Sequence, residues 1–177
     1  MNYQKITSPD INNGLGCRVT LWISGCPHRC PGCHNSETWD NLSGKPFDDD
    51  AFSQLFDKLN KPYIKGLTLS GGEPLDLSNC EKLSTILEII RRFRDRYGSC
   101  KDIWVFTGNQ LKDLETNTVA KEILKEIDYL VDGRFEIKKL DKSLPFRGSS
   151  NQCIYKKNPK TGQFGIDEEL CDIDVDI

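Results

Sequence analysis

The stretch CRVTLWISGCPHRCPGCHN, residues 17–35, joins a short apolar run to a loop that contains three closely spaced cysteines. Its first part, residues 17–24, is rich in β-branched and aromatic residues and stops at Gly25, which predicts a strand that leads directly into the loop. The loop also contains two prolines and Gly32, which interrupt regular structure. The sequence therefore predicts a strand whose carboxyl end presents the three cysteines.

Strands and helices are predicted to alternate along the rest of the chain. Short apolar runs that end at turn residues predict strands, and apolar residues at helical spacing predict the helices between them. The Ser-x-x-Glu pattern of Ser78 and Glu81 is typical of the first turn of a helix. The predicted strands span residues 67–70, 102–106 and 129–132, and the predicted helices span residues 48–60, 78–97 and 119–127.

This alternation implies an α/β fold of mostly parallel strands joined by right-handed crossover connections. The chain has too few strand–helix units for a closed eight-fold barrel, so an open sheet or a partial, open β/α barrel remains. At 177 residues we expect one domain, residues 1–177, with a core over about residues 10–155. The last eleven residues, 167–177, carry six carboxylates and are expected to form a solvated tail or an edge strand.

Composition and charge argue against several classes of protein. The formal net charge is −3, whereas a general nucleic-acid binder normally has a basic surface. No apolar run approaches the roughly 18 residues that a membrane span needs. The polar N-terminal residues have no signal-peptide pattern. We therefore expect a cytoplasmic protein whose partners include neither nucleic acid nor a membrane.

Eight cysteines are many for a reducing compartment, where thiols stay free. Cys26, Cys30 and Cys33 are clustered among turn-forming residues, and in such a compartment this pattern indicates a metal site or catalysis. The other five are scattered and are expected to be ordinary small side chains, buried or half-buried. These five are Cys17, Cys80, Cys100, Cys153 and Cys171.

Two kinds of metal site suit three clustered cysteines. A structural zinc ion takes four ligands in a closed tetrahedron, and His28 or His34 would have to supply the fourth. Zinc modules usually pair two short knuckles that lie apart in sequence, whereas these residues all lie in one loop. A cubane 4Fe-4S cluster has four irons, so three thiolates hold three corners and leave the fourth iron open. We expect His28 to be solvent-exposed.

The pattern Cys-x3-Cys-x2-Cys after a strand resembles the cluster-binding loop of the radical S-adenosylmethionine enzymes. The resemblance implies that Cys26, Cys30 and Cys33 hold a 4Fe-4S cluster. It also implies that the amino and carboxylate groups of S-adenosylmethionine chelate the open iron. The fold that it implies is the partial, open β/α barrel of this family.

A second motif supports the same resemblance. LTLSGGEPL, residues 67–75, resembles the family's Gly-Gly-Glu motif at the end of its second strand. The resemblance implies that Gly71 and Gly72 let the backbone approach the cofactor without a Cβ in the way. It also implies that Glu73 offers its carboxylate to the methionyl ammonium, as a charge-assisted hydrogen bond.

Further candidate residues lie at strand ends and beside the last cysteine. Thr107, Gly108 and Asn109 follow the third predicted strand, where the resemblance implies contact with ribose or methionine. Asp132 ends the next strand, where this family often has polar residues. Much of the family has an aromatic residue just before the last cysteine, where this chain has Gly32, so His34 is the candidate to pack against adenine. The alternative is a plain turn or a loop histidine without such a role.

Three stretches resemble one group within this family. DYLVDGRFE and LPFRGSSNQ, residues 128–136 and 144–152, and the opening at residues 10–35 resemble the activating proteins of anaerobic ribonucleoside-triphosphate reductase. The resemblance covers about residues 10–153. The run at residues 147–152 is interpreted as a hydrogen-bonded turn that closes the open edge of the sheet or as a contact with S-adenosylmethionine or with the partner, and a combined structural and docking role is favoured.

The resemblance implies reductive cleavage of S-adenosylmethionine at the cluster. The resulting 5′-deoxyadenosyl radical would then remove a hydrogen atom from a glycine of the reductase large subunit. A low-potential electron donor such as a flavodoxin is also implied. Three alternatives remain: an activase of another glycyl-radical enzyme, of the formate-lyase type; a small radical enzyme that acts on a free metabolite; and a zinc-binding interaction module.

Overall fold

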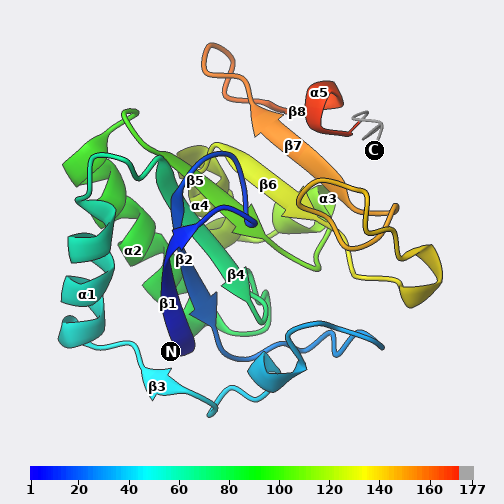
Figure 1. Cartoon of the computed structure of the whole chain (residues 1–177), viewed down its shortest axis with the longest axis horizontal. Coiled ribbons are helices and arrows are strands. Elements are labelled where there is room, and N and C mark those ends of the chain that lie inside the picture. The colour runs from blue at the N-terminus through cyan, green and yellow to red at the C-terminus, as the bar shows by residue number, and fades with distance from the viewer. Residues whose placement is uncertain (172–177) are drawn as a thin grey trace.

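Strand β2 (Arg18–Ile23), which the sequence predicts, lies inside a single open sheet. The computed structural model describes residues 1–171 (Figure 1). The other strands are β1 (Asn2–Asp10), β3 (Lys45–Pro46), β4 (Gly66–Gly71), β5 (Asp102–Phe106), β6 (Tyr129–Asp132), β7 (Cys153–Lys157) and β8 (Phe164–Ile166). Across the sheet the eight strands follow the order β3-β1-β2-β4-β5-β6-β7-β8.

The longer helices form where the sequence predicts them, because their apolar residues recur at helical spacing. They are α1 (Asp49–Leu59), α2 (Cys80–Tyr97) and α4 (Thr118–Glu126), and the shorter elements are α3 (Leu111–Leu114), α5 (Glu168–Cys171) and the 3-10 turns η1 (Ser36–Thr38) and η2 (Ile137–Lys139). Within residues 1–171, no helix is both long enough and apolar enough to span a bilayer.

The start of α2 differs from the prediction by one residue. The N-cap is Asn79, whose side chain accepts a hydrogen bond from the Lys82 N–H at 3.0 Å. Ser78, the predicted cap, instead donates its hydroxyl to the Asp76 carboxylate at 2.6 Å. The capping prediction is wrong at Ser78 because a nearby carboxylate takes its hydroxyl, and asparagine caps a helix as well as serine does.

The four central strands, β2, β4, β5 and β6, run parallel and follow chain order across the sheet. When every crossover is right-handed, sequential strand order puts all connecting helices on the same face of the sheet. Helix α2 accordingly packs against α4, and Figure 1 shows α1 beside α2. The prediction of an open α/β fold with parallel strands is confirmed for this central part.

The two faces of the central strands bury different side chains, because successive strand residues point to opposite faces. Val19 and Leu21 lie on the helix side, within a large apolar core. The opposite face carries Trp104 and Tyr129, whose rings stack with centroids 4.3 Å apart. This second face also carries a charged side chain, that of Arg18.

Arg18 is fully buried. Its guanidinium pairs with Asp102 at 2.6 Å and lies over the Trp104 ring, 5.5 Å from its centroid. It also donates to the Thr68 hydroxyl at 2.7 Å and to the Leu67 carbonyl at 2.8 Å. Burial lowers the pKa of Arg18 and raises the pKa of Asp102, although the attraction between them opposes both changes. Removing one partner would therefore leave a costly buried charge.

Antiparallel strands extend both edges of the sheet, and the sequence did not predict them. β1 and β3 pair on one edge, and β7 and β8 pair on the other, so the whole sheet is mixed. β1 (NYQKITSPD) and β7 (CIYKK) mix polar and apolar residues, because neither strand is buried along its whole length. The sheet thus runs from residue 2 to residue 166, beyond the predicted core at about residues 10–155.

The structure also differs from the prediction in the first part of the acidic tail, residues 167–171. Glu168–Cys171 form helix α5, and Leu170 is buried in the cluster that contains Trp104. The prediction of a solvated tail or an edge strand is therefore wrong for residues 167–171, because Leu170 provides an apolar anchor. Residues 172–177 lie outside the described residues.

Candidate functional site

The cysteine loop leaves β2 and turns sharply at the carboxyl ends of the parallel strands. Arg29 and Gly32 have positive φ angles of 45° and 76°, and the Cys33 N–H donates to the Cys30 carbonyl at 3.1 Å. These turns bring Cys26, Cys30 and Cys33 to the wall of one cavity of about 150 Å³. The structure therefore gathers the three predicted thiols at one place.

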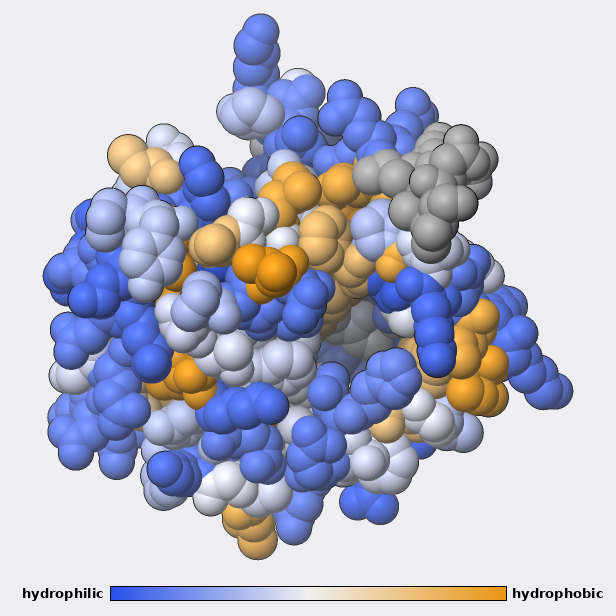
Figure 2. All heavy atoms as spheres, viewed as in Figure 1, coloured by the Kyte–Doolittle hydropathy of each residue, from blue (hydrophilic) through white to orange (hydrophobic). Residues whose placement is uncertain are grey.

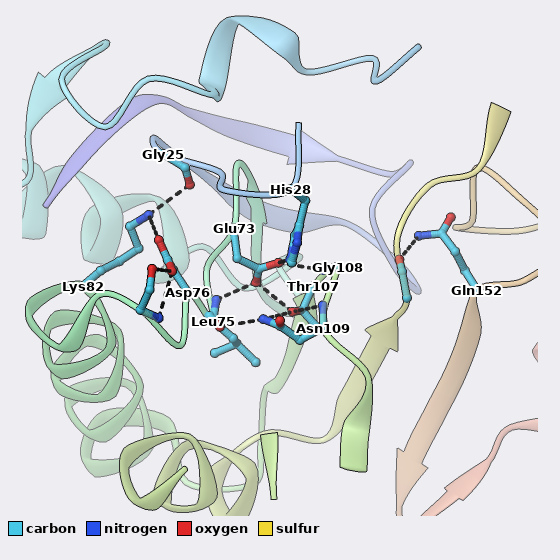
Figure 3. A network of polar contacts seen from close by, with 12 residues as sticks. Gly25, His28, Glu73, Leu75, Asp76, Lys82, Thr107, Gly108, Asn109 and Gln152 are labelled. Atoms are coloured by element: carbon cyan, nitrogen blue, oxygen red, sulfur yellow. Dashed lines mark hydrogen bonds and ion pairs between the residues drawn. The ribbon is translucent and has the colours of Figure 1, made fainter. Parts of the chain in front are cut away.

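Buried groups of the chain itself hold the start of this loop. The Cys26 N–H donates to the Trp39 carbonyl at 3.1 Å. Lys82 of α2 donates to the carbonyl of Gly25 at 3.0 Å and pairs with Asp76 at 3.4 Å (Figure 3). Lys82 and Asp76 are both buried, so the ion pair and the hydrogen bond to Gly25 are shielded from solvent. Helix α2 is thereby fixed to the residue that precedes the first cysteine.

Burial is the largest influence on the pKa of two of these thiols, Cys26 and Cys30. It raises the pKa of Cys26 and of Cys30, while the backbone N–H of Phe135 opposes that rise at Cys30. The Asn35 N–H donates to the sulfur of Cys33 at 3.4 Å. A metal must displace the thiol protons in such a site, and N–H groups aimed at sulfur favour the charged thiolates that result.

The side chains around the cavity are of types that fit an iron–sulfur group. Thiolates are the ligands that iron–sulfur clusters take. Trp39 lines the cavity, and its buried indole N–H has no partner among residues 1–171, so it can serve a group that binds there. Across that same part of the chain, no three His, Cys, Asp or Glu side chains converge closely enough to hold one ion.

The Gly-Gly-Glu turn packs directly against the end of β2. Gly71 has a φ of 101°, and a Cβ there would lie 2.7 Å from the backbone nitrogen of Ile23. A Cβ at Gly72 would lie 2.6 Å from the carbonyl oxygen of Gly25. The Gly72 N–H donates to the Ile23 carbonyl at 2.7 Å, and the Glu73 N–H donates to the Gly25 carbonyl at 2.8 Å. Both glycines are therefore required by chain packing, and their role in cofactor binding stays a prediction.

We expect Gly71→Ala to lower the free energy of unfolding by about 2 kcal/mol or more. A positive φ costs an alanine roughly 1–2 kcal/mol, and the added Cβ also meets the backbone of Ile23. Gly162→Ala is the matched control, because Gly162 has a φ of 73° and open space around it. Urea unfolding measures both variants. Equal losses at the two positions would contradict a contribution from the neighbouring strand.

Glu73 is fully buried, and donors of the chain fill all of its acceptor positions (Figure 3). Oε1 accepts from the Leu75 N–H at 2.8 Å and from the Thr107 hydroxyl at 2.7 Å. Oε2 contacts the Gly108 N–H at 2.7 Å and Nε2 of His28 at 2.8 Å. The prediction that His28 is solvent-exposed is wrong, because its side chain is only 7% exposed and reaches from the cysteine loop to Glu73.

The remaining candidates divide between this cavity and a second one of about 750 Å³. Thr107 lines the first cavity together with the cysteines and the Gly-Gly-Glu turn. Asn109 and Asp132 line the second. The two cavities adjoin, because both are lined by Gly108, Gly133 and Arg134.

Asn109, Asp132 and His34 have local contacts within the chain. The Asn109 side chain donates to the Leu75 carbonyl at 2.8 Å. Asp132 accepts from the Leu111 N–H at 2.8 Å, at the start of α3, and burial raises its pKa. His34 is exposed and lies outside both cavities, with its ring centroid 6.0 Å from that of Phe135. The structure therefore does not bring His34 together with the cysteines' cavity.

The run at residues 147–152 forms a hydrogen-bonded turn, as one of the two interpretations predicts. The Gln152 side chain accepts from the Gly148 N–H at 2.9 Å and donates to the Gly133 carbonyl at 2.9 Å. Asn151 donates to the Arg134 carbonyl at 2.8 Å. These bonds fasten the segment that follows β6 to the start of β7, beside the cysteine cavity.

Comparison with known proteins identifies the family. Residues 12–155 match the sequence family described as a 4Fe-4S single cluster domain. A protein of Pasteurella multocida (strain Pm70) is 44% identical over 158 residues, which are 88% of this chain and 98% of that protein. A protein of Escherichia coli (strain K12) is 43% identical over 157 residues, with 88% and 98% covered. One of Enterobacteria phage T4 is 40% identical over 156 residues, with 88% and 94% covered.

All three relatives are named anaerobic ribonucleoside-triphosphate reductase-activating protein. This chain belongs to that family. Membership in the activating-protein family confirms the resemblance found in residues 10–153. The matched 4Fe-4S domain spans the three cysteines and the Gly-Gly-Glu turn, and it argues against the zinc-binding module.

Several residues of the cavity wall are not among the sequence candidates for the cluster and cofactor site, including His28, Trp39 and Phe135. His28 lies between two of the cysteines, and that position was a signal that it faces the same site. Trp39 follows the loop within a polar stretch, where a large aromatic side chain is unusual. Phe135 reaches the cavity from the segment that follows β6, far from the cysteine loop in sequence, so local sequence carries no signal for it.

Proposed function

We propose that this chain activates anaerobic ribonucleoside-triphosphate reductase. When bound, a 4Fe-4S cluster and S-adenosylmethionine would supply, by one-electron reductive cleavage, methionine and a 5′-deoxyadenosyl radical that takes a hydrogen atom from a glycine of the reductase. The observation that carries the proposal is the convergence of three thiols and the Gly-Gly-Glu turn on one cavity. The names of the relatives support the choice of partner.

The chain's own residues would bind and orient these groups. Cys26, Cys30 and Cys33 would hold three irons and leave the fourth to the cofactor. Glu73 would bind the methionyl ammonium, beside backbone supplied by Gly71 and Gly72. The burial of Glu73 supports this role, because a carboxylate shielded from water attracts an ammonium more strongly than an exposed one does.

Thr107 would hold Glu73 in place through its hydroxyl. Asn109 and Asp132 would contact the ribose or the methionine from the adjoining cavity. We further propose that the open sheet is the partial barrel of the radical S-adenosylmethionine enzymes. Sequential order of β2, β4, β5 and β6 supports this, because that order is the one found in β/α barrels.

The partner would be the glycine-bearing segment of the reductase large subunit. An exposed projection at residues 136–142 stands beside the cysteine cavity and offers a place for it. Ile137 and Leu140 on this projection are 49% and 39% exposed. Figure 2 shows apolar surface at the right of the view, where Figure 1 draws this projection. The electron would come from a low-potential donor such as a flavodoxin. We also propose a cytoplasmic setting, where thiols stay reduced and available as cluster ligands.

An oxygen-free reconstitution tests the proposal. The protein is loaded with iron and sulfide, and dithionite and S-adenosylmethionine are added. We expect 5′-deoxyadenosine, and none when dithionite is omitted. With the reductase present, we expect the doublet signal of a glycyl radical by electron paramagnetic resonance. Absence of 5′-deoxyadenosine would overturn the chemistry. Its formation without a glycyl radical would keep the chemistry and reject this partner, in favour of another glycyl-radical enzyme or a free metabolite.

A further inference from the structure

The Glu73 carboxylate has no acceptor position left for a ligand. A carboxylate offers about four such positions, and four donors of the chain already occupy them. Yet the proposed function needs this carboxylate to bind an ammonium. One of the four donors must therefore leave when the cofactor enters.

Three of the donors are held in place by the fold. The Leu75 and Gly108 donors are backbone N–H groups. The Thr107 hydroxyl is buried at the end of β5 and also accepts from the Asn109 N–H at 3.1 Å. The fourth donor is the His28 ring, which stands on the cysteine loop and lines the cavity. Rotation about its side-chain bonds is enough to remove it.

Gly108 independently supports a specific place for the His28 ring beside Glu73, because a side chain at Gly108 would occupy that place. A Cβ at Gly108 would lie 2.4 Å from Cδ2 and 2.8 Å from Nε2 of that ring. The backbone of Gly108 is not left-handed, so its conformation alone would accept other residues. The space beside Glu73 is therefore shaped for the imidazole.

We propose that His28 is a placeholder for the ammonium group of the cofactor. In the free protein it satisfies the buried Glu73 carboxylate and keeps that carboxylate oriented. When an amino acid head group enters the cavity, its ammonium replaces Nε2 of His28 on Oε2 of Glu73. Because His28 lies between Cys26 and Cys30, this exchange also turns a side chain of the cluster loop. The inference rests on the proposed function.

If His28 competes with the ammonium for Glu73, His28→Ala should bind the ligand more tightly. If His28 only supports the fold of the site, His28→Ala should bind the ligand more weakly. His28→Ala removes the competitor from Glu73, so we expect the reconstituted protein to bind S-adenosylhomocysteine about tenfold more tightly, as loss of one charge-assisted competing hydrogen bond implies. This probe has the ammonium but no sulfonium to cleave. Isothermal titration under oxygen-free conditions measures its dissociation constant. Weaker binding in His28→Ala would overturn the placeholder.

The desamino analogue of S-adenosylhomocysteine, in which hydrogen replaces the amino group, is the matched control. We expect its affinity to be unchanged by His28→Ala, because it brings no ammonium to Glu73. His28→Gln retains a side-chain N–H donor and is expected to return the affinity for S-adenosylhomocysteine toward that of the natural chain. An equal gain for both ligands in His28→Ala would mean that the variant merely enlarges the cavity, and it would reject the exchange.

A double-mutant cycle tests the link between Gly108 and His28. Gly108→Ala should displace the ring and tighten binding of S-adenosylhomocysteine, and it should have little further effect in the His28→Ala background. Equal weakening in both backgrounds would show that the space belongs to the ligand and not to His28. If the natural chain binds no S-adenosylhomocysteine at all, the proposed function itself fails.

Discussion

Cys30→Ser is expected to lose most of the bound iron after oxygen-free reconstitution and to form 5′-deoxyadenosine at least about 100-fold more slowly. Removing one of three thiolates leaves too few protein ligands to hold a cubane, and even loss of an outer-shell partner of a metal site costs about 10–100-fold. Iron analysis, visible absorbance and product formation measure the effect.

The same variant should keep its fold. Cys30 lies on a loop outside both apolar clusters, so we expect an unchanged far-ultraviolet circular dichroism spectrum. Cys80→Ser and Cys100→Ser are the controls, because both residues are exposed and outside the cavity, and they should retain iron and activity. Full iron content in Cys30→Ser would contradict the three-thiolate site. An unfolded variant would instead favour a structural metal.

Asp102→Asn is expected to lower the free energy of unfolding by about 3 kcal/mol. It leaves the guanidinium of Arg18 charged and fully buried, with its ion-pair partner removed. The expected loss is at the lower end of the range for broken buried pairs, because the Asp102 side chain is itself 34% exposed. Urea unfolding under reducing conditions measures the change.

Glu88→Gln is the matched control for this substitution. Glu88 pairs with Arg92 on the surface of α2, and their side chains are 51% and 54% exposed. Such pairs contribute little, so we expect a change within about 0.5 kcal/mol. A loss in Asp102→Asn no larger than this control would show that the Arg18 pair does not stabilise the sheet.

The central elements were predictable because each carries its signal locally. β2 and β4 are buried along almost their whole length, carry large apolar residues at alternate positions, and lead into glycines. The edge strands β1 and β7 were missed because their partly exposed residues dilute the apolar pattern. The burial of Leu170 was also not predictable from local sequence, because one apolar residue in an acidic stretch does not indicate the cluster that buries it.

The candidate site was predictable where its residues are close in sequence. The spacing of Cys26, Cys30 and Cys33 indicates one site, and the Gly-Gly-Glu motif indicates a second stretch at the same sheet edge. The expectation that His28 lies in solvent is wrong: its place between two cysteines is a local signal for the site, but the room that Gly108 leaves for its ring is visible only in the fold. His34 is the sequence candidate for contact with adenine, but it lies outside both cavities.

The sequence by itself determined the alternation of strands and helices, the family, and the three thiols with their Gly-Gly-Glu partner motif. These features depend on neighbouring residues, whose spacing decides periodicity and ligand geometry. Only the tertiary structure decided that Arg18 is buried against Asp102, that Lys82 holds Gly25, and that His28 occupies Glu73. Those contacts join residues that are 45 to 84 positions apart, and which of them meet depends on how the sheet orders its strands.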